Sequence, residues 1–168
     1  MADKQKSTAN QLPQFVQYLA AIMGKLASPS PDEMDNILNQ IEEINPKQGP
    51  HFVTDLSAFY NLSNILYRRG KLTMGELSHA LAVPMSTATR AVERWVDSGF
   101  AQRLSDPDDR RIVRIDLTEN GKRLHEIIEN SISGSIQRAM SCLTSEEQSI
   151  LVALTRKVAQ GLTEVKTQ

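Results

Sequence analysis

The chain has 168 residues, 40% of them hydrophobic, a single cysteine and a formal net charge of −1. This length predicts one domain, or one domain with an extension, whose core needs neither disulfides nor metal. One cysteine excludes an internal disulfide, no apolar run approaches the roughly 20 residues of a membrane span, and the polar N-terminus lacks the apolar core of a secretion signal. We therefore expect a cytoplasmic protein that does not contact a membrane.

The charge is unevenly distributed along the chain. From Leu62 to Arg123 there are eleven Lys or Arg and eight Asp or Glu, a net charge of +3. The remaining residues have eight Lys or Arg and twelve Asp or Glu, a net charge of −4, and the two segments together give −1. A weakly basic segment in an acidic chain favours a protein that presents one face to an anion, although an excess of three charges is common on other surfaces.

Two amphipathic helices are predicted near the start of the chain. Residues 1–11 are polar and are expected to be disordered. Apolar residues at helical spacing predict a helix over 13–27. The sequence Ser-Pro-Asp-Glu at 30–33 has Ser as N-cap, Pro at N1 and Glu at N3, and so starts a second helix over about 31–45.

Three helices are predicted in the middle of the chain. A third helix runs over about 54–69, and Gly70 is the residue expected just beyond its end. A Thr-x-x-Glu capping box at 73–76 opens a short helix. The next helix occupies 84–98.

A β-hairpin follows this last helix directly. Residues 101–104 and 112–117 alternate between apolar and polar types, and the turn between them contains Asp-Pro-Asp-Asp at 106–109. Arg110 and Arg111 lie at its tip. A charged finger of this kind after a helix-turn-helix is typical of winged-helix proteins that bind DNA.

Two more helices complete the chain. Thr118 caps a long helix whose apolar stripe continues to Met140, and a capping box at 144–147 opens the last helix. The order of helix, helix and two strands over 73–117 predicts a winged helix-turn-helix.

The predicted fold class is therefore mainly α, with N- and C-terminal helices forming a dimerisation region around the winged helix-turn-helix. We expect an N-terminal helical arm at 1–50, a DNA-binding domain at 51–121 and C-terminal dimerisation helices at 122–168. The outer helices have long apolar stripes that a monomer of this size cannot cover, which favours a homodimer whose terminal helices interlock.

The helix at 84–98 is the predicted recognition helix, because the second helix of a helix-turn-helix enters the major groove of DNA. Its buried face is predicted to comprise Ala88, Ala91, Val92, Trp95 and Val96. Its outer face is predicted to contact DNA through Ser86, Thr87, Thr89, Arg90 and Arg94. Small hydroxyl side chains bond phosphates or bases at close range, and arginine pairs with guanine through two hydrogen bonds. The alternative is an ordinary solvated helix face.

The tip of the hairpin is a second predicted contact. Arg110 is placed to enter the minor groove, where narrow A·T tracts concentrate negative potential. Asp108 or Asp109 is expected to hold the arginine by a charge-assisted hydrogen bond. The alternative is an Asp-Arg turn that only shapes the hairpin.

Three segments of the chain resemble the MarR family of bacterial and archaeal transcription regulators: LTMGELSHAL, MSTATRAVERWVDSGFAQR and DPDDRRIVRIDLTENGKRL. The most specific stretch is Asp-Arg-Arg followed by Val-x-x-x-Leu-Thr-x-x-Gly. The resemblance covers about 53–141 and implies a homodimer that binds a near-palindromic operator in double-stranded DNA. It maps the wing arginine onto Arg110, its orienting acid onto Asp108, and a second candidate arginine onto Arg111.

The chain departs from the family pattern at its N-terminus. Family members usually have one helix before the helix that here begins near Thr54, whereas this chain has two. The family's ligand pockets lie between the arm and the DNA-binding lobe, so this extra helix leaves open whether a small-molecule effector relieves repression. Tyr18, Tyr60, Tyr67 and His51 are candidates to line such a cavity, although residues of this kind more often belong to the core.

Redox and metal chemistry have little support in the sequence. Cys142 has no flanking Lys, Arg or His closer than Arg138, which favours a small buried packing residue over a redox sensor. His51, His79 and His125 lack the spacing of metal ligands, so no metal and no cofactor are expected.

No sequence motif indicates an enzyme, since the chain lacks a glycine-rich phosphate loop and a Ser/His/Asp grouping. The predicted function is a sequence-specific DNA-binding regulator, with repression favoured over activation. The alternative is a winged-helix protein-interaction module without DNA binding. The first is favoured because DNA requires arginines on one face, and an interaction module does not.

Overall fold

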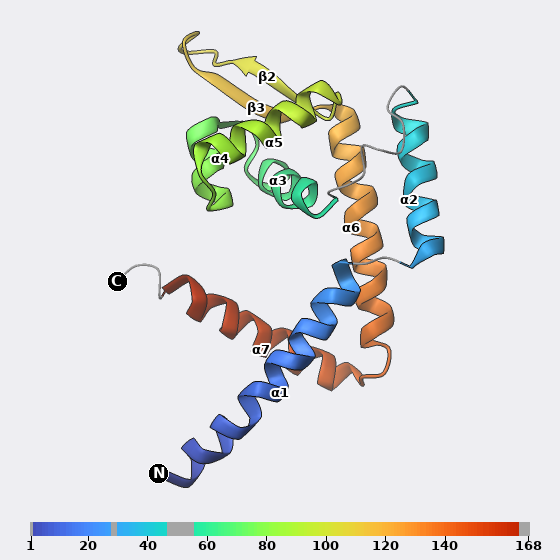
Figure 1. The fold of residues 1–168 in the computed structure, drawn as a ribbon, viewed down its shortest axis with the longest axis vertical. Coiled ribbons are helices and arrows are strands. Elements are labelled where there is room, and N and C mark those ends of the chain that lie inside the picture. The colour runs from blue at the N-terminus through green and yellow to red at the C-terminus, as the bar shows by residue number, and fades with distance from the viewer. Residues whose placement is uncertain (1, 28–29, 47–55, 165–168) are drawn as a thin grey trace. The chain divides into compact units, whose positions relative to one another are not determined.

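The computed structural model of the chain describes residues 2–27, 30–46 and 56–164 (Figure 1). In chain order its elements are α1 (Ala2–Ala27), α2 (Pro31–Ile44), α3 (Leu56–Arg69), β1 (Leu72–Thr73), α4 (Met74–Leu81), α5 (Met85–Asp97), β2 (Ala101–Ser105), β3 (Val113–Leu117), α6 (Glu119–Met140) and α7 (Ser145–Glu164). The chain divides into two compact units between Ile132 and Ser133, within α6. Helix α3, the hairpin and the helices on either side of it follow the prediction closely.

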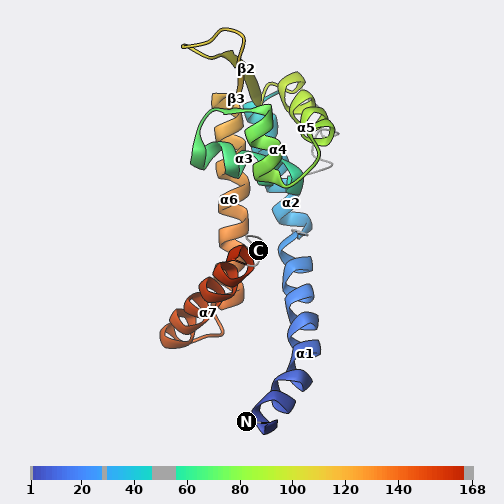
Figure 2. The same ribbon diagram turned by 90° about the vertical axis from the view of Figure 1, so that its left-hand side faces the viewer.

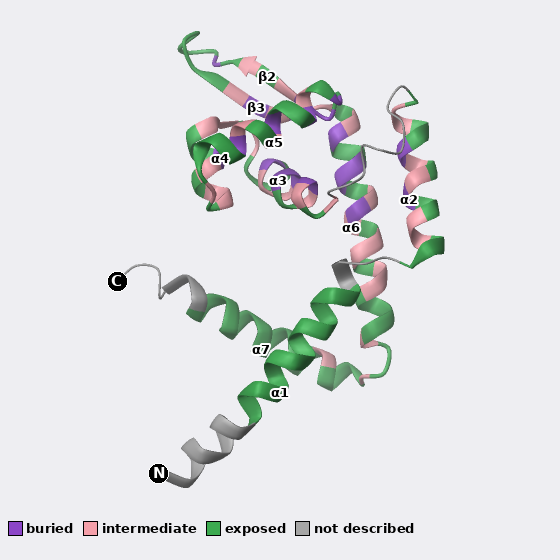
Figure 3. Ribbon diagram, viewed as in Figure 1, coloured by how far each residue is buried: buried purple, intermediate pink, exposed green. Residues whose placement is uncertain are grey.

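Helix α1 begins at Ala2, so the expectation of disorder over residues 1–11 is wrong for all but the first of them. Residues 2–11 are rich in Ala, Lys and Gln, which are good helix formers, and these outweigh the polar composition on which the prediction was based. Pro13 lies inside the helix. The side chains described in α1, from 11 to 25, are all exposed (Figure 3).

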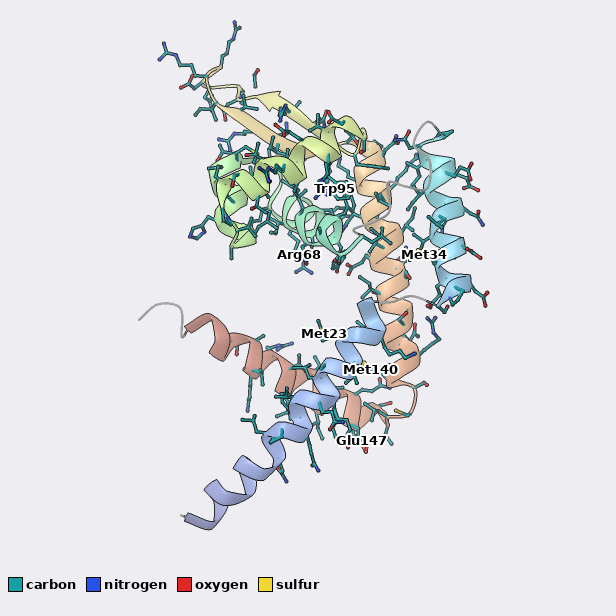
Figure 4. All side chains as sticks on the ribbon, viewed as in Figure 1. Met23, Met34, Arg68, Trp95, Met140 and Glu147 are labelled. Atoms are coloured by element: carbon teal, nitrogen blue, oxygen red, sulfur yellow. The ribbon has the colours of Figure 1, made fainter. Side chains whose placement is uncertain are left out.

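The core of the first unit is built around Phe59 of α3, which is completely buried. Its ring meets Trp95 of α5 edge to face at a centroid distance of 4.4 Å, and Phe100 at 6.0 Å. Figure 4 shows Trp95 among the side chains of this core. Each large apolar side chain buried here contributes roughly 1.5–3 kcal/mol to folding, so these rings account for much of the stability of the unit.

Helix α2 is part of this core, through Ile37 and Ile41. Its C-terminal end is also tied to the rest of the unit by side-chain amides. Asn45 Nδ2 donates to the Ser98 carbonyl oxygen at 2.8 Å, and Asn120 Nδ2 donates to the carbonyl oxygen of Ile44 at 3.3 Å. Helix α2, the additional N-terminal helix, therefore packs against the end of α5 and the start of α6.

The sheet has three antiparallel strands in the order β1-β3-β2. The predicted hairpin is confirmed, with Ala101 opposite Leu117 and Arg103 opposite Ile115. Strand β1 adds Leu72 opposite Ile115. The sequence did not predict β1, because two residues are too few to show an alternating pattern.

The Leu-Thr-x-x-Gly segment joins the hairpin to α6. Thr118 Oγ1 donates to the Gly99 carbonyl oxygen at 2.6 Å and accepts the N–H of Gly121 at 3.0 Å. A Cβ atom on Gly121 would lie 1.9 Å from the carbonyl oxygen of Phe100. Glycine is therefore required at 121 because backbone from the loop before β2 packs directly on the first turn of α6.

Gly121→Ala is expected to lower the free energy of unfolding by about 3 kcal/mol, because the methyl group collides with backbone rather than with a flexible side chain. The matched control is Gly134→Ala on the same helix, where the added Cβ would have only the Arg138 side chain nearby, at 3.5 Å. That substitution is expected to be neutral or to stabilise by about 0.5–1 kcal/mol. Urea denaturation measures both values, and equal effects would contradict the close approach at Gly121.

Candidate nucleic-acid interface

The orientation of α5 is set by a short turn after α4. Thr73 and Glu76 form the predicted capping box at the start of α4. Helix α4 ends at Ala82, which adopts a left-handed conformation with φ of 55°. Ser78 Oγ then donates to the Val83 carbonyl oxygen at 2.8 Å, and the N–H of Val83 donates to the Ser78 carbonyl at 3.2 Å. These bonds hold α4 and α5 at a defined angle.

The buried face of α5 agrees with the prediction. Ala88, Val92 and Trp95 are buried, and Ala91 and Val96 are half-buried. Since one face is packed in the core, the opposite face is constrained to meet solvent.

The outer face of α5 presents four of the five predicted contact residues. Ser86, Thr87, Arg90 and Arg94 are exposed, whereas Thr89 is half-buried. Thr89 Oγ1 donates its hydrogen to the carbonyl oxygen of Met85 at 2.8 Å. Its hydroxyl oxygen is therefore left only as an acceptor, and Thr89 is the weakest of the five candidates.

The β2–β3 hairpin extends beyond α4 and α5 (Figure 2). In the middle of β2, Arg103 lies 3.7 Å from Glu93 of α5, with both side chains about half exposed. An exposed pair of this kind contributes roughly 0–1 kcal/mol, so it adds little to the stability of the hairpin.

The tip of the hairpin is organised by Asp106, which is buried although its neighbours in the turn are exposed. Its Oδ1 accepts the backbone N–H of Asp108 at 2.9 Å and of Asp109 at 3.2 Å, as in an Asx turn. Its Oδ2 is bonded to Nε of Arg114 on β3. One carboxylate thus ties the turn to the strand that follows it.

Arg114 also connects the hairpin to α4, because its Nη1 lies 3.8 Å from Glu76 Oε2. The Arg114 guanidinium, helped by the two turn N–H groups, holds the pKa of Asp106 below its ordinary value. Asp106 in turn raises the pKa of Arg114. The pKa of Glu76 is lowered chiefly by the backbone N–H of Thr73 that it accepts in the capping box. These three charged groups stay ionised at neutral pH and keep the wing connected to the helix-turn-helix.

Arg110 and Arg111 are exposed at the tip, as predicted. Among the described residues, Arg110 forms no ion pair with Asp108 or Asp109, and the carboxylate of Asp109 accepts the backbone N–H of Arg111 at 2.9 Å. The role of Asp108 as the orienting acid therefore stays a prediction.

Sequence reasoning missed Asp106 and Arg114 as the residues that hold the tip in place. The Asp-Pro-Asp-Asp order contains a usable signal, since aspartate at the first position of a turn commonly accepts the N–H two residues later. Pairing of Asp106 with Arg114 depends on the hairpin register and has no local signal.

The structure also locates residues that the sequence raised as possible redox, metal or effector contacts. Cys142 is exposed, with Sγ donating to the Ala139 carbonyl at 3.3 Å, so the prediction of a buried packing residue is wrong for this chain. It follows α6 in a turn, beyond the apolar stripe from which burial was inferred. His51 lies outside the described residues, Tyr18 is exposed and His125 is buried.

Within the parts of the chain that the structure describes, no three His, Cys, Asp or Glu side chains come together in a way that could hold a metal ion. The described helices also include none that is long and apolar enough to cross a membrane.

Comparison with known proteins agrees with this geometry. The model of the MarR family matches residues 64–113, which run from α3 through the wing tip. The uncharacterised HTH-type transcriptional regulator YwhA of Bacillus subtilis is 30% identical over 127 residues, which are 73% of this chain and 87% of the relative. The regulator YybA of the same organism is 28% identical over 97 residues, or 58% of this chain and 65% of the relative, so the match spans just under two thirds of that protein.

A solved structure extends the likeness to nearly the whole chain. A MarR family protein from Bacillus stearothermophilus superposes with a TM-score of 0.65 at 26% identity, covering 94% of this chain and 97% of the other. The winged-helix fold is thus confirmed, including the helices outside the matched family segment.

Asp106→Asn is expected to loosen the wing tip, because the neutral amide loses the charge-assisted bond to Arg114. The lowered pKa of Asp106 means that its contribution is present above the ordinary value of 3.8 and is lost as the pH falls toward the folded value. Heteronuclear NOE values of the Asp108 and Asp109 amides should fall in the variant, and in the wild type at low pH. Asp116→Asn on β3 is the control, because within the described part of the chain its carboxylate accepts the N–H of the adjacent Leu117 and holds no turn.

Proposed function

The chain belongs to the MarR family of transcription regulators, and we propose that it binds a near-palindromic operator as a homodimer and represses transcription from it. The observation that carries this proposal is the exposed face of α5, which presents Arg90 and Arg94. It is accompanied by a wing that ends in Arg110 and Arg111 and whose tip is held in place by Asp106. In this assignment α5 occupies the major groove and the wing reaches the adjacent minor groove.

The two contacts have different tasks. Arg90 lies next to the small hydroxyl side chains of Ser86 and Thr87 on a face that the core orients rigidly, so it is assigned to read base edges. Arg110 lies on a tip whose backbone is held by Asp106, and is assigned to affinity and register. A tip that is already ordered loses little conformational entropy when it meets DNA.

Apolar side chains on the terminal helices support the homodimer. Helix α1 exposes Phe15, Leu19, Ile22 and Met23 at helical spacing, and its described residues are coloured as exposed throughout in Figure 3. Helix α7 separately exposes a second set, namely Ile150, Leu151, Val152, Leu154 and Val158. Monomeric proteins rarely leave apolar stripes of this length in water, and a second copy of the chain is the occupant that provides matching stripes.

The function is tested by selecting DNA sites from a genomic library with the purified protein and titrating the selected duplex at several salt concentrations. We expect an inverted repeat whose half-sites are about one helical turn apart, and an affinity that falls at least ~tenfold between 50 and 200 mM salt. No selected site together with a salt-independent affinity would favour the protein-interaction module instead.

Arg110→Ala is expected to weaken operator binding by about 1–3 kcal/mol with little change in sequence preference, and to reduce the salt dependence by about one phosphate contact per subunit. Arg156→Ala on α7 is the control, since this arginine lies outside the winged helix-turn-helix. Fluorescence anisotropy gives both affinities. If the two variants bind equally well, the wing has no part in recognition.

Arg90→Ala is expected to change base preference as well as affinity, by roughly 1–3 kcal/mol against the preferred base. Binding to operators with each base substituted in the half-site measures this. An unchanged order of preference would reassign Arg90 to a phosphate contact.

Leu19→Glu combined with Ile22→Glu is expected to shift the protein toward monomers at low micromolar concentration, because the substitutions place charge in the apolar stripe of α1. Gln17→Glu, on the polar side of the same helix, is the control, and sedimentation equilibrium gives the masses. Deleting the arm through residue 48 is a poorer test, since it removes the core residues Ile37 and Ile41. A double variant that stays dimeric would remove α1 from the interface.

A further inference from the structure

Helix α5 separates its polar and apolar residues sharply, with one exception. Met85, its first residue, is 48% exposed, whereas the other apolar side chains of the helix are buried or half-buried. A single exposed apolar side chain is common on protein surfaces, so its meaning depends on where it lies. This one lies in the first turn of the proposed recognition helix, directly before Ser86 and Thr87. In a helix-turn-helix this is the end of the helix that contacts base edges in the major groove.

The side chain of Met85 reaches the surface between the first turns of α4 and α5. A Cβ atom on Gly75, in the first turn of α4, would lie 3.9 Å from Met85 Cε, which is an ordinary van der Waals distance. Gly75 is itself exposed and has no side chain that could cover the methyl end of Met85. The thioether therefore remains accessible from solvent. Since methionine is unbranched and has three rotatable side-chain bonds, it adapts readily to the shape of a partner.

Thr89, one turn further along, lies on the same side of α5 as Met85. Its Oγ1 donates to the carbonyl oxygen of Met85 at 2.8 Å, so its hydroxyl hydrogen is already used within the helix. Successive helical positions rotate by about 100°, which places Arg90 about 140° away from Met85 around the helix axis. The two sides of the exposed face thus differ in chemistry. The side with Met85 suits an apolar contact, and the side with Arg90 suits charge and hydrogen bonds.

Thymine is the base that offers an apolar group in the major groove, namely its C5-methyl group. The other three bases present hydrogen-bond donors and acceptors there. A thioether has no donor and is a weak acceptor, so a methionine packed against those edges would leave polar groups without partners. The chemistry of Met85 therefore fits thymine better than any other base.

We propose that Met85 is a specificity-determining residue of the regulator and selects a thymine in each half-site of its operator by packing on the C5-methyl group. This inference rests on the proposed function, because it concerns the operator that the protein binds. Each half-site is then read in two ways, by hydrogen bonds from Arg90 and by apolar contact from Met85. The second kind of contact adds sequence preference without adding to the salt dependence of binding.

The test replaces the thymines of the selected operator by uracil, one position at a time and in both half-sites. Uracil lacks only the C5-methyl group and pairs with adenine in the same way. Fluorescence anisotropy then gives the affinity of the full-length protein for each duplex. We expect one thymine position at which uracil weakens wild-type binding by about fourfold per half-site, or roughly fifteenfold for the two together, which is the effect of burying one methyl-sized group in each.

Met85→Gln keeps the length of the side chain and replaces the thioether by an amide. In this variant the loss of affinity caused by uracil at that position is expected to disappear, while losses at thymines contacted by other residues persist. Met85→Leu is the matched control, because leucine remains apolar and is expected to retain most of the uracil effect. Circular dichroism verifies that both variants fold.

A uracil effect that is lost in Met85→Gln and kept in Met85→Leu would support the proposal. Half-sites without a thymine, a scan without a sensitive thymine, or uracil effects that are equal in the wild type and Met85→Gln would overturn it. None of these three results contradicts the proposed function, which requires only that an operator is selected and bound in a salt-dependent manner. Failure to select any operator would contradict the proposed function and this inference together.

Discussion

The packing of Trp95 against Phe59 is the interaction on which the presentation of α5 depends. A helix with small residues and arginines around much of its surface can rotate about its axis unless large side chains fix it. Trp95, with Val92 and Ala88, buries one stripe of α5 on α3, and the edge-to-face contact at 4.4 Å adds directionality to an otherwise non-directional apolar contact. Ser86, Arg90 and Arg94 are exposed together as a consequence. The residues proposed to read DNA are thus oriented by residues that never reach it.

The wing depends on a different kind of interaction. A two-stranded hairpin has little core of its own, and this one is held by β1 at one edge and by charge at its tip. Asp106 closes the turn and Arg114 connects that carboxylate to Glu76 of α4, whose other contacts cap the helix. Glu76 thus caps the first helix of the helix-turn-helix and, through Arg114 and Asp106, also orients the wing. This arrangement couples the two proposed DNA contacts mechanically, because a displacement of α4 also moves the hairpin.

The same unit contains α2, the extra N-terminal helix. The side-chain amide of Asn45, at the end of α2, donates to the Ser98 carbonyl oxygen at the end of α5. Helix α3 carries Phe59 on its core side and Tyr60 and Tyr67 beside α6.

The sequence by itself determined most of the helices, the hairpin and the exposed arginines, because these follow from local rules, although it did not predict the first ten residues of α1. Capping boxes start α2, α4 and α7, the alternating residues define β2 and β3, and helical spacing separates the two faces of α5. The requirement for Gly121, the bond between Asp106 and Arg114, and the burial of His125 beside Ser63 were decided only by the tertiary structure. The last of these pairs joins residues 62 positions apart. Such contacts depend on how whole elements pack, and neither composition nor spacing along the chain contains that information.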